Sequence, residues 1–236
     1  MLAWLGEKNH DYLTGNRRVQ DAVRRAQFTA DRALLVSLAA NPVALVRAAA
    51  AKNIGLPEPI LGKLINEDPD RSVRKAVAEN PQIMLLVSLA SNSSTPDELA
   101  ALVRKPFPCV REKVALNALT PVEVLKALAE NDPRRMVRLA AAKNPGTPWE
   151  SVAVVLSKIE KEPIHGVVGT VMHDIAGPCD GPEYMFFNTY GIVGYGYVGN
   201  TLKIAKEILD LHYNERRSIL EKLKELNAEL YEALKK

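Results

Sequence analysis

The stretch AENDPRRMVRLAAAKNPGTP, residues 129–148, contains a motif that the chain repeats: Asp-Pro, three variable residues, Val-Arg, an alanine-rich run and Asn. Aligned on the Val-Arg pair, the matching copies are NPVALVRAAAAKN (41–53), DPDRSVRKAVAEN (68–80), KPFPCVREKVALN (105–117) and DPRRMVRLAAAKN (132–144). A fainter copy, RVQDAVRRAQFTAD (18–31), keeps Val-Arg without the proline. A recurrence with this period predicts stacked supersecondary units.

Each copy predicts one short helix. Asp68, Asp132 or Asn41 can accept hydrogen bonds from the free amides of a first helical turn, and the proline that follows fits the first helical position. The small side chains after Val-Arg allow a neighbouring unit to approach closely. The closing Asn tolerates the left-handed conformation of a helix end, so we expect the helix to stop there.

A second helix start follows in three of the units. TPDE (95–98), TPVE (120–123) and TPWE (147–150) each place Thr as cap, Pro at the first position and Glu where it can reach back, which predicts capping boxes. The inward positions of these second helices are Leu35/Leu38, Leu61/Leu64, Leu99/Leu102, Leu125/Leu128 and Val152/Val155. The segment MLLVSLASNSS (84–94) predicts an extra helical turn or loop within the longest repeat interval. Because neither helix of a unit can bury its apolar face alone, stacking is expected to form the core.

The fold class predicted is all-α, with about five short helical repeats in an α-solenoid over residues 18–158. Hydrophobic residues make up 47% of the chain but aromatic residues only 6%, which favours packed helices over an all-β fold. We expect an N-terminal cap over 1–17, a glycine-rich loop or partly β segment over 159–200, and a long amphipathic helix over 201–236. The apolar seam of that helix consists of Ile219, Leu223, Leu226, Leu230 and Leu234. Such a seam either packs back on the repeats as a cap or pairs with a second copy in a homodimer.

The repeat also carries a resemblance. The run D/N-P-x-x-x-V-R-x-A-x-A-x-N, followed by T-P-x-x-x-L-x-x-L-A, resembles the leucine-rich repeat variant family over about residues 18–158. The resemblance implies units that pair an α-helix with a shorter 3₁₀ helix in a right-handed superhelix. Some proteins of that kind carry a cysteine-ligated iron–sulfur domain at the N-terminus, but no cysteine precedes Cys109 here. The HEAT-like repeats of alkylpurine DNA glycosylases are similar in architecture and not in motif.

Positive charge is concentrated in the repeats: residues 15–158 contain 21 Lys and Arg against 14 Asp and Glu. One arginine per copy would form a ladder along the stack, and further basic residues lie beside it. The ladder consists of Arg47, Arg74, Arg111 and Arg138, and its neighbours are Arg71, Lys75, Arg134 and Arg135. These residues either track the phosphates of a nucleic acid or tie each unit to the next, and exposure distinguishes the two. The repeats hold few aromatic platforms for bases, namely Phe28, Phe107 and Trp149.

Two further groups of residues lie beyond the repeats. The metal-competent residues His165, His173, Asp174, Cys179 and Asp180 match no metal-ligand spacing, so no metal site is expected. Gly194, Gly196 and Gly199 form G-x-G-x-x-G, and this stretch resembles the first strand-turn-helix of nucleotide-sugar dehydrogenases, in which such glycines let the backbone approach a pyrophosphate. The chain after Gly199 is too short to build the rest of a dinucleotide fold. The alternatives are phosphate or nucleotide binding and a simple connecting turn.

No residue set in the sequence indicates catalysis or a cofactor. The sequence favours a non-catalytic repeat scaffold that binds a macromolecular partner, preferably a protein, along the solenoid surface. Nucleic-acid binding through the Arg/Lys stripe is the first alternative, and phosphate binding at Gly194–Gly199 is the second. The chain has two cysteines, no run of 18 apolar residues and no export signal, so we expect a cytoplasmic protein with no membrane partner.

Overall fold

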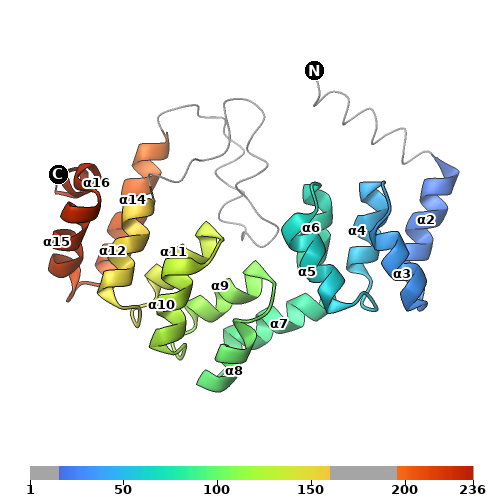
Figure 1. The fold of residues 1–236 in the computed structure, drawn as a ribbon, viewed down its shortest axis with the longest axis horizontal. Helices are drawn as coiled ribbons and strands as arrows, with labels where there is room; N and C mark the ends of the chain where they lie inside the picture. The colour runs from blue at the N-terminus through green and yellow to red at the C-terminus, as the bar shows by residue number, and fades with distance from the viewer. Residues whose placement is uncertain (1–15, 160–195, 236) are drawn as a thin grey trace. The chain divides into compact units, whose positions relative to one another are not determined.

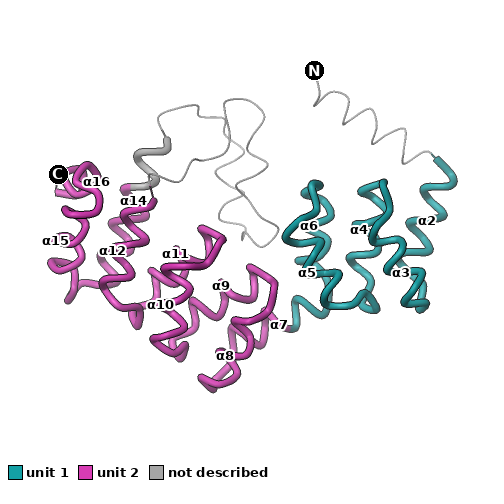
Figure 2. The backbone as a smooth tube through the Cα atoms, in the orientation of Figure 1, with its two compact units in different colours: residues 1–85, 169–180 teal, residues 86–168, 181–236 magenta. Residues whose placement is uncertain are grey.

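The computed structural model describes residues 16–159 and 196–235, and within these ranges the chain forms fourteen α-helices and no β-strand (Figure 1). The predicted all-α fold class is therefore confirmed for this part of the chain. None of these helices is both long and apolar enough to span a bilayer. The helices belong to two compact units, a first unit of residues 16–85 and a second unit of residues 86–159 and 196–235 (Figure 2).

The first unit repeats one arrangement of paired helices. Its helices are α2 (Arg17–Phe28), α3 (Arg32–Ala39), α4 (Ala44–Lys52), α5 (Glu58–Glu67), α6 (Arg71–Ala78) and the start of α7 (Pro81–Asn92). Helix α4 packs against both α2 and α6, while α3 packs on α4 and α5 packs on α6. The Val-Arg copies of this unit therefore lie side by side in chain order. The insertion predicted over residues 84–94 is largely helix α7.

The second unit shows the same alternation. Its helices are the rest of α7, then α8 (Pro96–Leu102), α9 (Pro108–Leu116), α10 (Val122–Asn131), α11 (Arg135–Lys143), α12 (Trp149–Lys158), α14 (Gly196–Leu211), α15 (Arg216–Leu226) and α16 (Ala228–Leu234). Helix α11 packs against both α9 and α14, and α12 packs against both α10 and α15. The pair α14 and α15 therefore occupies the position that a further repeat would have.

Small and aliphatic side chains fill the space between neighbouring helices. Ala49, Ala50 and Ala51 of α4 are buried, and so are the alanines of α11 at the same place in the motif. The pairs predicted to face inward from the second helices, from Leu35/Leu38 to Val152/Val155, are all buried as well. Each unit thus has the core that the repeat pattern predicts.

The tail forms three helices, although the sequence predicted one long helix over 201–236. Helix α14 already begins at Gly196, and the helical path is interrupted after Leu211 and at Asn227. The side chain of Asn227 accepts a hydrogen bond from the Leu230 amide and so starts a new helix. The seam residues are buried within the chain, except Leu226, which is half-buried: Ile219, Leu223, Leu230 and Leu234. The tail therefore packs back as a cap, and a second copy would have to use another surface of it.

The predicted helix starts at Asp-Pro are wrong by two residues, because the helices begin two positions after the proline. Helix α11 begins at Arg135, and Asp132 accepts a hydrogen bond from the Arg134 amide at 2.9 Å, before the helix starts. Asn41 forms the same turn with the amide of Val43, also at 2.9 Å. These side chains stabilise the turn that joins one helix pair to the next, and the helix starts only after that turn.

The predicted capping boxes are also wrong. No threonine side chain caps α8, α10 or α12. Instead, the hydroxyl of Thr120 donates to the carbonyl oxygen of Val114 at 2.5 Å, and that of Thr147 donates to Ala141 at 2.6 Å. The last turn of a helix leaves carbonyl groups without a partner in that helix, and these buried hydroxyls satisfy one of them.

The asparagines that close each copy are not left-handed. Asn144 has φ −78° and ψ 122°, and Asn53 and Asn117 are extended as well. Every helix of the described ranges is an α-helix, whereas the family resemblance implied a shorter 3₁₀ helix in each unit. The segments predicted as N-terminal cap and glycine-rich segment lie mostly outside the described residues.

Candidate functional site

The repeated arginine of the first unit binds an aspartate of the next copy. Arg47 donates from Nε to Oδ2 of Asp68 at 2.8 Å and from Nη2 to Oδ1 at 2.9 Å, while its Nη1 donates to the carbonyl oxygens of Asn41 and Pro42. The Arg47 side chain is 13% exposed and that of Asp68 is 3% exposed. The hydrogen bond to the Asp68 carboxylate raises the pKa of the Arg47 guanidinium, which therefore stays protonated in this bidentate pair.

The second unit repeats this contact. Arg111 donates from Nε to Oδ2 of Asp132 at 2.7 Å and from Nη2 to Oδ1 at 3.3 Å, again across 21 residues. Arg74 and Arg138 each donate Nη1 to the backbone carbonyl of the aspartate that opens their own copy, Asp68 at 2.7 Å and Asp132 at 2.6 Å. The four ladder arginines therefore hold neighbouring copies and turns together. Of the two roles considered, this is the structural one.

The basic residues beside the ladder do not form an open row. Arg71, Arg134 and Arg135 are half-buried, and Arg135 donates to the carbonyl oxygen of Ile159 at 3.4 Å. Lys75 is exposed and lies 3.8 Å from the Glu79 carboxylate. Lys52 binds the same carboxylate at 2.7 Å, and this contact lowers the pKa of Glu79. Few of these basic side chains are therefore exposed to the phosphates of a nucleic acid.

A second ladder, which the sequence reasoning missed, is formed by the closing asparagines Asn53, Asn80, Asn117 and Asn144. The Asn144 amide nitrogen donates to the carbonyl oxygens of Ala115 at 2.8 Å and Asn117 at 2.9 Å, at the helix end of the preceding copy. The Asn144 side-chain oxygen accepts the Gly146 amide at 2.9 Å. Each ladder asparagine thus satisfies carbonyls that a helix end leaves open, and it fixes its own turn at the same time. The recurrence of Asn in every well-matched copy was the signal that could have revealed this role.

His212 continues the asparagine ladder at the C-terminal end. It directly follows α14, and its Nε2 lies 2.8 Å from the carbonyl oxygen of Ala142. Ala115, whose carbonyl oxygen accepts from Asn144, lies two residues before Asn117, and Ala142 lies two residues before Asn144 in the same way. The His212 ring therefore takes the place of the next ladder asparagine. The His212 side chain is buried. It therefore closes the open carbonyl of α11 where the repeats end.

Exposed apolar side chains follow the asparagine ladder. We call ladder edge the last residues of α2, α4, α9, α11 and α14 and the turns that follow them up to the first residue of the next helix, together with helix α7; each unit carries its own part of this edge. Ten large apolar side chains are exposed in the described residues, and all ten lie on this edge: Phe28, Ile54, Met84 and Leu85 in the first unit, and Leu89, Leu116, Leu119, Val122, Leu211 and Tyr213 in the second. Phe28 is 80% exposed and Tyr213 is 76% exposed. Within either unit, such a group of exposed apolar side chains is typical of a protein-interaction surface.

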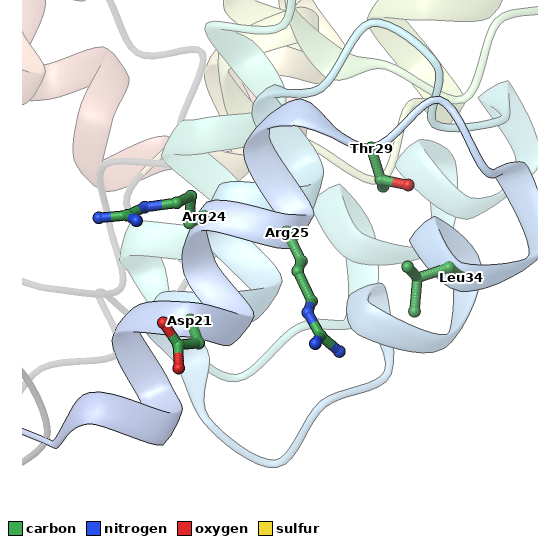
Figure 3. Close-up of a pocket in the computed structure, with 5 residues that line it drawn as sticks. All are labelled: Asp21, Arg24, Arg25, Thr29 and Leu34. Carbon is green, nitrogen blue, oxygen red and sulfur yellow. The ribbon is translucent and has the colours of Figure 1, made fainter.

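A shallow hollow adjoins this edge in the first unit. It measures about 600 Å³ and is lined by Asp21, Arg24, Arg25, Thr29 and Leu34. Arg25 extends between α2 and α3 on the side of Leu34, whereas Arg24 points away from it across α2 (Figure 3). Both arginines are exposed, so the hollow is open and basic.

The remaining predicted site residues lie wholly or partly outside the described part of the chain. Gly196 and Gly199 lie in the first turn of α14, and Gly194 lies outside the described residues, so phosphate binding there stays a prediction. The metal-competent residues between His165 and Asp180 also lie outside them. Within the described ranges no three His, Cys, Asp or Glu side chains are arranged to hold a metal ion.

Comparison of the chain with protein-family models, with curated proteins and with solved structures gives no match in any of the three.

Proposed function

We propose that this chain is a non-catalytic scaffold, an α-solenoid of the leucine-rich repeat variant type, that binds a protein partner through the ladder edge. The observation that carries the proposal is the confinement of all ten exposed large apolar side chains of the described residues to that edge. Burying such side chains on binding is favourable by about 25 cal/mol per Å² of apolar surface. A partner that covers several of them gains affinity without any catalytic group.

The contacts of the polar repeat residues support the same proposal. The repeated arginines and asparagines, together with Asp68 and Asp132, are bonded to one another or to backbone carbonyls within and between the copies. They stabilise the stack and are unavailable to a ligand. The side chains that remain for recognition are those that vary from copy to copy, and on the ladder edge these include the ten exposed apolar side chains.

The test is site-specific photocrosslinking followed by a measured affinity. A benzophenone amino acid replaces Ile54 on the ladder edge or, as control, Lys63, which is exposed in the middle of α5. A protein that crosslinks from position 54 and not from position 63 is then purified and titrated against the wild-type chain and against Ile54→Asp. We expect the substitution to weaken binding at least about tenfold, because it places a charge in the centre of an apolar contact.

Equal affinity of the partner for the wild-type chain and for Ile54→Asp would contradict the proposal. Crosslinks to RNA or DNA alone would favour the nucleic-acid alternative.

A further inference from the structure

We infer that the partner segment bound by the first unit is an acidic amphipathic one, with aliphatic or aromatic side chains on one face and carboxylates beside them. This inference rests on the proposed function and names the chemistry of the partner. Its basis is an apolar row on the ladder edge of the first unit and a basic hollow next to that row.

Hydrogen bonds join the backbone segments that carry the apolar row. The Asn53 amide donates to the carbonyl oxygens of Ala26, Gln27 and Thr29 at 2.9, 3.2 and 3.1 Å. These carbonyls flank Phe28, and Ile54 follows Asn53, so the two exposed side chains lie on turns that touch.

The row extends to helix α7 in the same way. The side chain of Gln82 donates to the carbonyl oxygens of Ile54 and Leu56. The first turn of α7 is therefore held against the turn that carries Ile54, and the exposed side chains of Met84 and Leu85 follow within three residues of Gln82. Phe28, Ile54 and these two side chains form one apolar strip along the first unit.

Positive charge borders the Phe28 end of the strip. Arg24 and Arg25 precede Phe28 by one helical turn, and Arg32 follows it by four residues; all three are exposed. Within the described part of the chain neither Arg24 nor Arg25 forms an ion pair with a neighbour. Asp21 is the carboxylate that lines the hollow with them (Figure 3).

The nearby Asp31 offsets part of this charge, although its carboxylate is held at the start of α3. Its carboxylate accepts the amides of Ala33 and Leu34 at 2.9 and 3.1 Å as the cap of α3. Residues 16–85 contain eleven Lys and Arg against seven Asp and Glu. The electrostatic complement of this rim is a partner with carboxylates.

A protein segment fits these surroundings better than a nucleic acid. Nucleic-acid binding needs basic groups along the path of the backbone and aromatic rings for the bases. The strip holds one aromatic side chain, Phe28, and its other members are aliphatic. Aliphatic side chains contribute to binding affinity when they are buried against apolar groups of a partner. An amphipathic helix presents such groups at every third or fourth position.

The experiment compares labelled peptides of about 16 residues, or about four helical turns, by fluorescence anisotropy on the full chain. One peptide is an amphipathic Leu/Glu helix, the second has Lys in place of Glu, and the third has Ser in place of Leu. We expect the Leu/Glu peptide to bind at least about tenfold more tightly than either of the others, with an affinity that falls as salt is added. The single variants Arg24→Glu and Arg25→Glu should each weaken it, while Lys63→Glu, the same charge change on α5, should not.

The outcomes separate this inference from the function on which it rests. If the Leu/Lys peptide binds as well as the Leu/Glu peptide and both lose affinity in Ile54→Asp, the apolar edge stands and the acidic partner is wrong. If the Leu/Glu peptide binds no better to the wild-type chain than to Ile54→Asp, the proposed function falls as well. Tighter binding of a single-stranded RNA of about 12 nucleotides than of the Leu/Glu peptide would overturn the inference in favour of nucleic acid.

Discussion

Arg47 with Asp68, and Arg111 with Asp132, each act as one unit, and the loss of either residue leaves a buried charge without its partner. We expect Arg111→Ala and Asp132→Ala each to lower the free energy of unfolding by about 3–5 kcal/mol. The double variant should lose less than the sum, with a coupling of about 0.5–3 kcal/mol, because the two residues contact each other. Urea unfolding measures all three. Arg104→Ala, at an exposed position, is the control, and strictly additive losses would show that the pair does not interact.

The arginine and asparagine contacts illustrate what a sequence can and cannot reveal about single residues. The repeat shows that Arg47 and Asn53 recur, and hence that they serve the repeat. Their acceptors lie 21 to 27 residues away, in the neighbouring copy. Local capping rules assign Asn to the end of its own helix and Asp to the start of the next, because they contain no information on distant carbonyls. The contacts become visible only when the copies are stacked.

We expect Glu112 to make the stability of the folded chain depend on pH. It is half-buried on α9, and burial raises its pKa although Lys113 and Lys143 lower it in part. A raised carboxyl pKa favours the protonated form in the folded state. The protonated carboxyl therefore contributes its full stabilisation below the ordinary pKa, and this stabilisation is lost as the pH rises through the pKa of the folded state. Glu112→Gln should therefore raise the melting temperature at neutral pH, with the gain disappearing in mild acid. The control is Glu123→Gln on the exposed side of α10; an equal gain there, or one that persists in acid, would contradict the assignment.

At the scale of elements, the sequence predicted the helices and their buried faces but not all of their ends. The Val-Arg and Leu-x-x-Leu periodicities place the inward faces correctly because burial follows the helical period. The Thr-Pro motif was misleading because Thr120 and Thr147 bond backward to the preceding helix, in competition with the cap. The tail was read as one helix because its apolar period continues across Asn227, where the side chain of the asparagine starts α16.

If His212 takes the role of a ladder asparagine, helix α14 is equivalent to a repeat helix at the end of the stack. His212→Ala should lower the free energy of unfolding by about 1–3 kcal/mol, since the buried carbonyl of Ala142 loses its donor. His212→Asn should recover a large part of that loss, because asparagine holds the matching carbonyls elsewhere in the chain. Chemical unfolding curves of both variants decide this. If Asn is no better than Ala at this position, the equivalence of α14 with a repeat helix is wrong.

At the scale of the molecule, the arginine contacts predict weak nucleic-acid binding despite a basic repeat region. The guanidinium groups of Arg47 and Arg111 are neutralised by aspartates inside the chain, so they release few counterions on binding. We expect single-stranded RNA and duplex DNA to bind with dissociation constants no tighter than about 10⁻⁶ M at physiological salt. Anisotropy titrations at several salt concentrations measure this. Submicromolar binding that is lost in Lys75→Glu but kept in Lys63→Glu would instead identify a phosphate-binding stripe.

The repeated polar residues join one copy to the next, which leaves recognition to the apolar ladder edge. The most direct measurement is the free energy of unfolding of Asn144→Ala beside that of Asn131→Ala, an exposed asparagine at the end of α10. Asn144→Ala leaves the carbonyls of Ala115 and Asn117 and the Gly146 amide without their bonds, so we predict a loss of at least about 1–3 kcal/mol. For Asn131→Ala we predict a change within about 0.5 kcal/mol. Equal small changes in the two variants would contradict the account.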